Sequence, residues 1–196
     1  MRHNISEINE IIKDRRTIYP EQFSSRKVHK EIIEEFLDNA RWAPTHGMTQ
    51  PWRFKVFLNE GLNKFSEFQS KLYKEITPQD SFKDIKYNKL KERPLNSSAV
   101  IAICMERQES EKIPELDEIA AVSCAVQNIQ LTAAAYGIGC YWSTGGVTFK
   151  DETKTFLGLG KKDKCLGFLY IGYPEIDWPK GQRRPIEYYT EWITEY

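Results

Sequence analysis

The segment that most restricts the fold runs from Ile119 to Tyr136, where nearly every residue is small or apolar. This composition predicts a long helix with apolar residues on all sides, and Gly137 provides its stop. A helix that is apolar all round is a buried helix. Because a chain of 196 residues offers few places to bury such a helix within one molecule, we expect it at an interface between subunits.

A second apolar segment, Ala99–Met105, is short and continuous, as is typical of a central strand covered on both faces. Residues 77–97 are charged and interrupted by proline, which indicates a mobile excursion with one helix. Periodicity predicts further helices at about residues 5–15, 29–42, 62–76 and 148–157, and strands at 54–58, 140–142 and 165–172. With no internal repeat and no linker, residues 1–196 are expected to form a single domain.

Charge and hydropathy argue against several functional classes. Lysine plus arginine equals aspartate plus glutamate at 28 each, so no basic field points to nucleic acid. No apolar run approaches the roughly 20 residues that cross a bilayer. The N-terminal residues lack the apolar core of a signal peptide. We therefore expect a cytoplasmic protein without a membrane or nucleic-acid partner.

The cysteines and histidines do not form a pattern typical of metal sites. Cys104, Cys124, Cys140 and Cys165 are far apart in apolar surroundings, which favours buried, reduced thiols over disulfides or metal ligands. The three histidines are too few and too scattered for a zinc site. No metal is expected.

The loop at residues 41–53 is the richest candidate for ligand binding. It contains two prolines, a glycine, a histidine, two threonines, a glutamine and two tryptophans, without apolar periodicity. It lies between an expected helix and an expected strand, and loops held by rigid elements commonly carry binding groups. We interpret it as a ligand-binding loop.

Three other segments suit an anion or a planar ligand, and each has a structural alternative. Residues 15–17 (Arg-Arg-Thr) can hold phosphate oxygens, or the arginines can complement the dipole of the preceding helix. Residues 143–146 (Ser-Thr-Gly-Gly) offer hydroxyls and a backbone that a ring can approach, or form a plain turn. Residues 183–184 (Arg-Arg) can clamp a phosphate or remain solvated.

The order and spacing of these segments resemble the FMN-dependent nitroreductase family, and most of all its compact bacterial branch. The matching features, from about residue 4 to 184, are the arginine pair with its hydroxyl, an Ala-Pro-x-x-x-x-x-Gln-Pro-Trp loop, a buried helix ending in Gly-Ile-Gly, a Trp-x-Thr-Gly loop and Gly-Phe-Leu-Tyr-Ile-Gly-Tyr-Pro. The resemblance implies an α+β fold with a mixed, mainly antiparallel sheet flanked by helices. It also implies a homodimer with a helical interface and two FMN sites there.

The resemblance assigns roles to individual residues. The FMN phosphate and ribityl chain would be held by Arg15, Arg16 and Thr17. The pyrimidine and N5 edge of the flavin would pass Ser143, Thr144, Gly145 and Gly146. The partner subunit would contribute its copies of Pro44, Thr45, His46 and Gln50. A second phosphate contact would come from Lys154, Arg183 or Arg184, and the sequence does not choose among them.

The implied activity is a ping-pong cycle in which NAD(P)H, either NADH or NADPH, passes a hydride through flavin N5 to an electron-poor acceptor such as a nitroaromatic, a quinone or an activated alkene. The alternatives are another redox reaction of FMN, such as dehydrogenation or dehalogenation, and a protein that binds flavin or another anion without turnover. Positioning and electrostatics carry such catalysis, so no acid–base residue is required and His46 is the one candidate. Met48 and Tyr19 depart from the family, replacing an asparagine of many larger relatives and a common basic residue.

Overall fold

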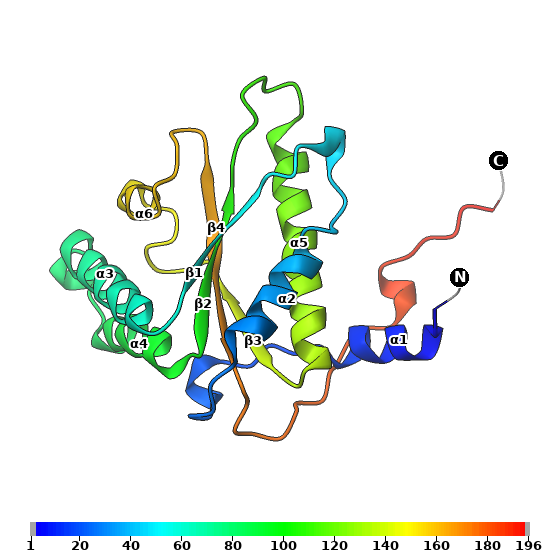
Figure 1. Ribbon diagram of the computed structural model, residues 1–196, viewed down its shortest axis with the longest axis horizontal. Helices are drawn as coiled ribbons and strands as arrows, with labels where there is room; N and C mark the ends of the chain where they lie inside the picture. Colours follow the sequence, from blue (N-terminus) through cyan, green and yellow to red (C-terminus); the bar gives the residue numbers. More distant parts are fainter. Residues whose placement is uncertain (1–2, 195–196) are drawn as a thin grey trace.

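A four-stranded antiparallel sheet with the strand order β1-β2-β4-β3 organises the computed structural model, which describes residues 3–194 (Figure 1). The strands are β1 (Trp52–Phe57), β2 (Ala99–Met105), β3 (Gly139–Ser143) and β4 (Lys164–Gly172). The helices are α1 (Ile5–Asp14), α2 (Lys30–Ala40), α3 (Glu60–Ile76), α4 (Asp84–Asn96), α5 (Glu115–Ala135) and α6 (Asp151–Phe156). Short 3₁₀ turns are η1 (Pro20–Gln22), η2 (His46–Met48), η3 (Gln79–Ser81) and η4 (Ile186–Tyr188).

The central strands confirm the reading of the apolar runs. Every residue of β2 is buried, and β2 pairs with β1 on one side and β4 on the other. The sheet itself is antiparallel throughout. The parallel component is a single bridge between Thr17 and Cys140, which ties the segment after α1 to β3.

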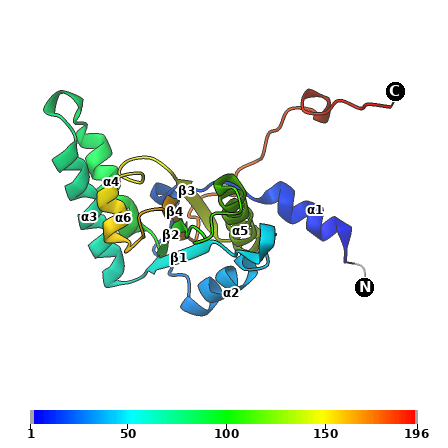
Figure 2. The same cartoon turned by 90° about the horizontal axis from the view of Figure 1, so that it is seen from above.

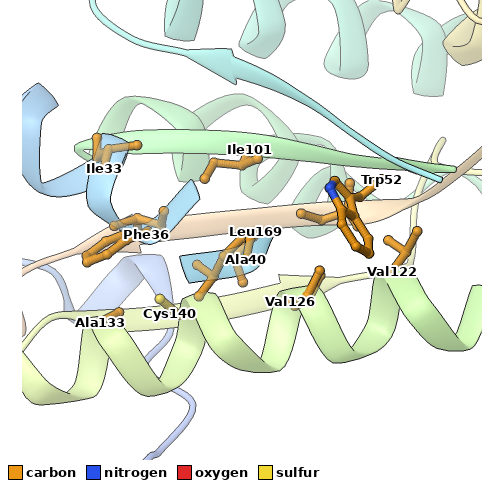
Figure 3. Packing of buried hydrophobic residues seen from close by; sticks show 14 of the residues in the cluster. Ile33, Phe36, Ala40, Trp52, Ile101, Val122, Val126, Ala133, Cys140 and Leu169 are labelled. Atoms are coloured by element: carbon orange, nitrogen blue, oxygen red, sulfur yellow. The ribbon is translucent and has the colours of Figure 1, made fainter. Parts of the chain in front are cut away.

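Two helical layers cover the sheet, α2 and α5 on one face and α3, α4 and α6 on the other (Figure 2). Alternate residues of β2 enter the two layers, because successive side chains of a strand point to opposite faces. On the α5 side, Ile101 and Leu169 pack with Phe36, Val122 and Val126 (Figure 3). The sheet therefore separates two apolar cores.

Helix α5 is longer than expected and is buried on one side. It begins at Glu115 rather than Ile119, since three acidic residues in its first turn favour a helix N-terminus. The side that faces the sheet is buried, whereas Leu116 and Cys124 are exposed on the opposite side. All four cysteines are free thiols, but the expectation that all are buried is wrong for Cys124.

The helix expected within residues 77–97 is α4, and it packs along α3. Ser66 and Gln69 on α3 donate side-chain hydrogen bonds to the carbonyl oxygens of Lys91 and Leu90 on α4. The segment is therefore part of a helical layer and not an excursion from the fold. Its mobility stays a prediction.

The terminal segments extend from the α5 side of the molecule (Figures 1 and 2). Helix α1 has no buried residue, and apolar side chains on it and on the C-terminal segment are exposed, namely Ile5, Ile8, Ile12, Ile186, Tyr188, Tyr189, Trp192 and Ile193. Among residues 3–194, no helix is long and apolar enough to cross a membrane, and no group of side chains is suited to a metal ion.

A bulge in β4 supports the end of β3. The pairing of β2 with β4 shifts between Ile103 and Cys104, next to Leu166 and Gly167 on β4. The indole nitrogen of Trp142 donates a hydrogen bond to the Leu166 carbonyl at 3.2 Å. Gly167 has a φ of 136°, and a Cβ there would lie 2.3 Å from that indole nitrogen. Only glycine fits against Trp142 at this position.

Candidate functional site

Three arginines gather where α1 ends. Arg15 donates a hydrogen bond at 3.1 Å to the Gln130 side chain of α5, and Arg16 donates one at 3.0 Å to the Pro179 carbonyl of the C-terminal segment. Arg16 and Arg183 line one cavity of about 400 Å³. We call Arg15, Arg16 and Arg183 the arginine cluster.

Within residues 3–194, no carboxylate forms an ion pair with the arginine cluster. Partial burial lowers the pKa of Arg15, and the nearby Arg183 and Arg16 lower it further. Guanidinium groups in this arrangement suit a phosphate, whose oxygens accept several charge-assisted hydrogen bonds.

The C-terminal segment is fitted tightly to this cluster. A Cβ on Gly181 would lie 1.9 Å from the Arg16 side-chain nitrogen Nη2, so the chain passes the guanidinium closely and a side chain at residue 181 would displace it. This close passage explains how residues distant in sequence, Arg16 and Arg183, come to line one cavity.

Strand β3 leads from the arginine cluster to a larger cavity. Its start is joined to the segment after α1 by the bridge between Thr17 and Cys140, with the Ile18 amide donating to the Cys140 carbonyl at 3.2 Å. The three residue steps from Cys140 to Ser143 span about 10 Å of strand. Tyr19 lies beside this strand, with its ring 4.9 Å from that of Tyr141.

The larger cavity, of about 710 Å³, lies between β3, α4 and the loop that follows β3. We call it the α4 cavity. All four residues predicted from the Thr-Gly loop line it, namely Ser143, Thr144, Gly145 and Gly146. Gly146 has a φ of 68°, and a Cβ there would lie 3.1 Å from Leu90 of α4, so the loop approaches the helix closely. The volume is typical of sites for small organic molecules, about 300–1,000 Å³.

Arg93 and Tyr141 also line the α4 cavity, and the sequence analysis missed both. Arg93 lies over the Tyr141 ring at 5.0 Å, and its Nε donates to Glu21 at 2.9 Å. Partial burial lowers the pKa of Arg93, but Glu21 outweighs this and raises it. Arg93 thus brings a basic group near Tyr19, the position at which the resemblance implies a basic residue. No local signal marks Arg93, because α4 joins the site only in three dimensions.

The loop at residues 41–53 lies apart from both places. None of its residues lines the α4 cavity or the cavity beside Arg16. Pro44, Thr45 and Gln50 line a separate hollow of about 400 Å³. His46 Nδ1 contacts Asp117 at 2.7 Å, at the start of α5. The loop residues expected from the partner therefore do not meet the other predicted residues within one chain.

The backbone of this loop is unusual. Gly47, Met48 and Gln50 have φ values of 58°, 56° and 45°. These values lie in the left-handed region that residues other than glycine rarely adopt. The backbone amide of Gln50 donates a hydrogen bond to the Thr45 hydroxyl at 3.1 Å, which helps to hold the loop in this conformation. Such outliers are frequent at binding sites.

Two of the three candidates for a second phosphate contact lie outside the arginine cluster. Lys154 on α6 lines another cavity with Cys165, and its Nζ donates to the Lys161 carbonyl at 2.5 Å. Cys140, next to the cluster, pairs with Ile171, about 20 Å along β4 from Cys165. Within one chain, Lys154 therefore lies apart from the arginine cluster. Arg184 lies 4.2 Å over the Tyr188 ring, which leaves Arg183 as the residue beside Arg16.

The architecture defines an α+β protein with an antiparallel sheet between two helical layers. A family model described as the Nitroreductase family matches residues 12–173. The chain belongs to the nitroreductase family, a family of oxidoreductases.

Individual relatives agree with this membership. A Bacillus subtilis protein that carries the name "Putative NAD(P)H nitroreductase YfhC" is 29% identical over 189 residues, covering 94% of this chain and 93% of the relative. A nitroreductase-like family protein from Bacillus cereus has a crystal structure with a TM-score of 0.80 at 28% identity, covering 100% of this chain and 98% of that one. A Desulfovibrio desulfuricans protein crystallised in complex with FMN has a TM-score of 0.71 at 20% identity, covering 99% and 100%. This last likeness concerns the fold.

Proposed function

We propose that this chain is an FMN-dependent oxidoreductase that transfers hydride from NAD(P)H to an electron-poor acceptor in a ping-pong cycle. The observation that carries the proposal is an arginine cluster connected by one strand to a cavity of small-molecule size. The FMN in the Desulfovibrio structure and the name of the Bacillus subtilis relative support the cofactor and the donor.

The described residues fit FMN at both ends. Its phosphate carries about two negative charges, which Arg15, Arg16 and Arg183 would neutralise. The ribityl chain would follow Thr17 and β3, and the planar ring would lie in the α4 cavity beside Thr144. When bound, FMN supplies a two-electron carrier that takes hydride at N5 and passes it on.

The protein's own groups would act by binding and by electrostatics. Arg93 and the amides of Gly145 and Gly146 would stabilise negative charge on the pyrimidine edge of the ring. A preorganised charge of this kind is effective because it needs no reorganisation during the reaction. Leu90 and Tyr170 would keep water from the inner wall of the cavity.

We further propose a homodimer in which the loop at residues 41–53 of one subunit completes the site of the other. The exposed side of α5 and the exposed apolar residues of α1 offer an interface of the helical kind. Burial of apolar surface drives such association. His46, held through Nδ1 by Asp117, is the candidate to tune the flavin or donate a proton. We place the protein in the cytoplasm, where its four free thiols stay reduced.

The direct test is the colour of the purified protein and its response to reductant. We expect a yellow protein whose colour is bleached by NADH or NADPH in the absence of oxygen. Addition of a nitroaromatic, a quinone or an activated alkene should restore the yellow colour. Restoration by a halogenated aromatic alone, with loss of halide, would favour dehalogenation. A colourless protein that takes up no added FMN would overturn the flavin assignment.

A further inference from the structure

The wall of the α4 cavity formed by α4 is strongly cationic. Lys86 and Lys89 on α4 line the cavity together with Lys83, which directly precedes the helix, so all three lie on the side of α4 that faces the cavity. None of the three takes part in an ion pair found among residues 3–194. Asp84 is the acidic residue of the lining. We call Lys83, Lys86 and Lys89 the lysine face.

The lysine face differs from the inner part of the cavity. There, the cation is Arg93, and it already has Glu21 as its partner at 2.9 Å. The inner wall also includes Trp142, Leu90 and the largely buried Tyr170. The outer part of the cavity therefore has exposed ammonium groups, while the inner part is lined by aromatic and aliphatic side chains.

We infer that the lysine face binds the anionic group of the substrate that stacks against the proposed flavin. This inference rests on the proposed function, and it names a substrate class: a planar, electron-accepting or electron-donating ring that carries phosphate or carboxylate oxygens. The source of the anion is either the diphosphate of NAD(P)H or a carboxylate on the acceptor.

Charge and flexibility support this class of ligand. The whole chain has a formal net charge of +0, so the excess of lysine at this cavity is local. Clefts lined by one sign of charge concentrate ligands of the opposite sign. A lysine ammonium on its flexible stem can follow anions at different distances, as two successive substrates of one site require. Ile85, 73% exposed at the same cavity, adds apolar contact for the ring.

The first test measures binding to the protein as purified and does not depend on turnover. Lys83→Gln/Lys86→Gln/Lys89→Gln is compared with Lys64→Gln/Lys71→Gln/Lys74→Gln, which removes the same charge from exposed positions on α3 outside the cavity. Titration calorimetry with 4-nitrobenzoate and its neutral analogue 4-nitrobenzamide gives the two dissociation constants. We expect the lysine-face variant to lose about tenfold in affinity for the anion, equal to about 1.4 kcal/mol. Its affinity for the amide, and both affinities of the α3 variant, should stay at the wild-type level.

The second test identifies the source of the anion. The FMN-loaded proteins are reduced without oxygen by NADH, by NADPH and by 1-benzyl-1,4-dihydronicotinamide, which has no diphosphate. Slower reduction by the dinucleotides alone assigns the lysine face to the donor. A higher KM for 4-nitrobenzoate alone assigns it to the acceptor.

Three results would overturn the inference. In the first, the wild type binds neither 4-nitrobenzoate nor 4-nitrobenzamide. In the second, the lysine-face variant binds 4-nitrobenzoate as tightly as the wild type does. The third result is a lysine-face variant that loses the same affinity for both ligands. Failure of the proposed function looks different. A protein that takes up no FMN yet binds 4-nitrobenzoate through the three lysines would keep the anion site and lose the flavin.

Discussion

The two parts of the candidate site differ in how much of them a single chain provides. The arginine cluster and the α4 cavity combine α1, β3, α4 and the C-terminal segment of one chain, and strand β3 connects them. The loop at residues 41–53 lines neither cavity, and Thr45, His46 and Gln50 in it bond to other loop residues or to Asp117. A single chain should therefore be able to bind ligand through the first part alone. The second should contribute only when two subunits associate.

The largest expected effect is on association. Cys124→Arg places a charge on the exposed side of α5, and we expect this charge to be buried without an acidic partner in the dimer. A buried, uncompensated charge costs about 3–5 kcal/mol. Light scattering should show a monomer, and Asn63→Arg on α3 should remain a dimer. If Cys124→Arg remains dimeric as well, this side of α5 is not the interface.

The next effect concerns the part contained in one chain. Arg15→Ala removes a charge-assisted phosphate contact, and FMN should bind more weakly by about 1.5–3 kcal/mol. Titration of the apoprotein with FMN, followed by flavin fluorescence, measures this loss. Lys71→Ala is the control, since Lys71 pairs with Glu75 on the surface of α3 at 3.8 Å. Unchanged affinity in Arg15→Ala would remove the arginine cluster from the phosphate site.

A smaller effect tests whether the loop acts across subunits. Gln50→Ala should weaken FMN binding by about 1 kcal/mol, the value of a typical hydrogen bond. The same substitution in the monomeric Cys124→Arg protein should have no effect. A loss of equal size in both backgrounds would mean that the loop acts within its own chain.

The smallest effect is on acid stability. Partial burial raises the pKa of Glu21, but its hydrogen bond with Arg93 and the Arg93 charge outweigh this and leave the pKa below its ordinary value of 4.5. A lowered pKa in the folded state stabilises at higher pH, and the contribution is lost as the pH falls below 4.5 towards the folded value. Because Glu21 is largely exposed, the contribution should be under about 1 kcal/mol.

Thermal unfolding from neutral pH into this acid range measures that contribution. Glu21→Gln should lower the Tm slightly at neutral pH and approach the wild type in acid, in monomer and dimer alike. Glu67→Gln, which changes an exposed residue of α3, should show no such convergence. A constant difference between Glu21→Gln and the wild type at all pH values would exclude the Glu21–Arg93 pair as its cause.

Most elements of the fold could be predicted because each has a strong local pattern. The continuous apolar run of β2 and the small apolar residues of α5 reflect burial that one stretch of sequence records. The start of α5 could not be located from apolar residues, since its first turn is acidic. Helix α4 was difficult to predict because its residues are mostly polar, and its contact with α3 holds it in place.

The site was predictable where neighbouring residues act together and not where distant segments meet. Ser143, Thr144, Gly145 and Gly146 line one cavity because they form one loop. Arg93 reaches that cavity only through the packing of α4, and no spacing in the sequence encodes it. The position of Arg183 beside Arg16 likewise depends on where the C-terminal segment passes, which no local pattern records.

The contact between Gly167 and the Trp142 indole restricts how this protein can evolve. A methyl group at residue 167 would overlap the indole, and a smaller residue at 142 alone would leave a void beside β4. A smaller residue at 142 would not admit a side chain at 167 either, because the Cβ of residue 167 would also lie 2.7 Å from the Ser143 carbonyl oxygen and the φ of 136° favours glycine. Because Trp142 directly precedes the loop from Ser143 to Gly146, variation in the shape of that loop must come from positions other than residue 167.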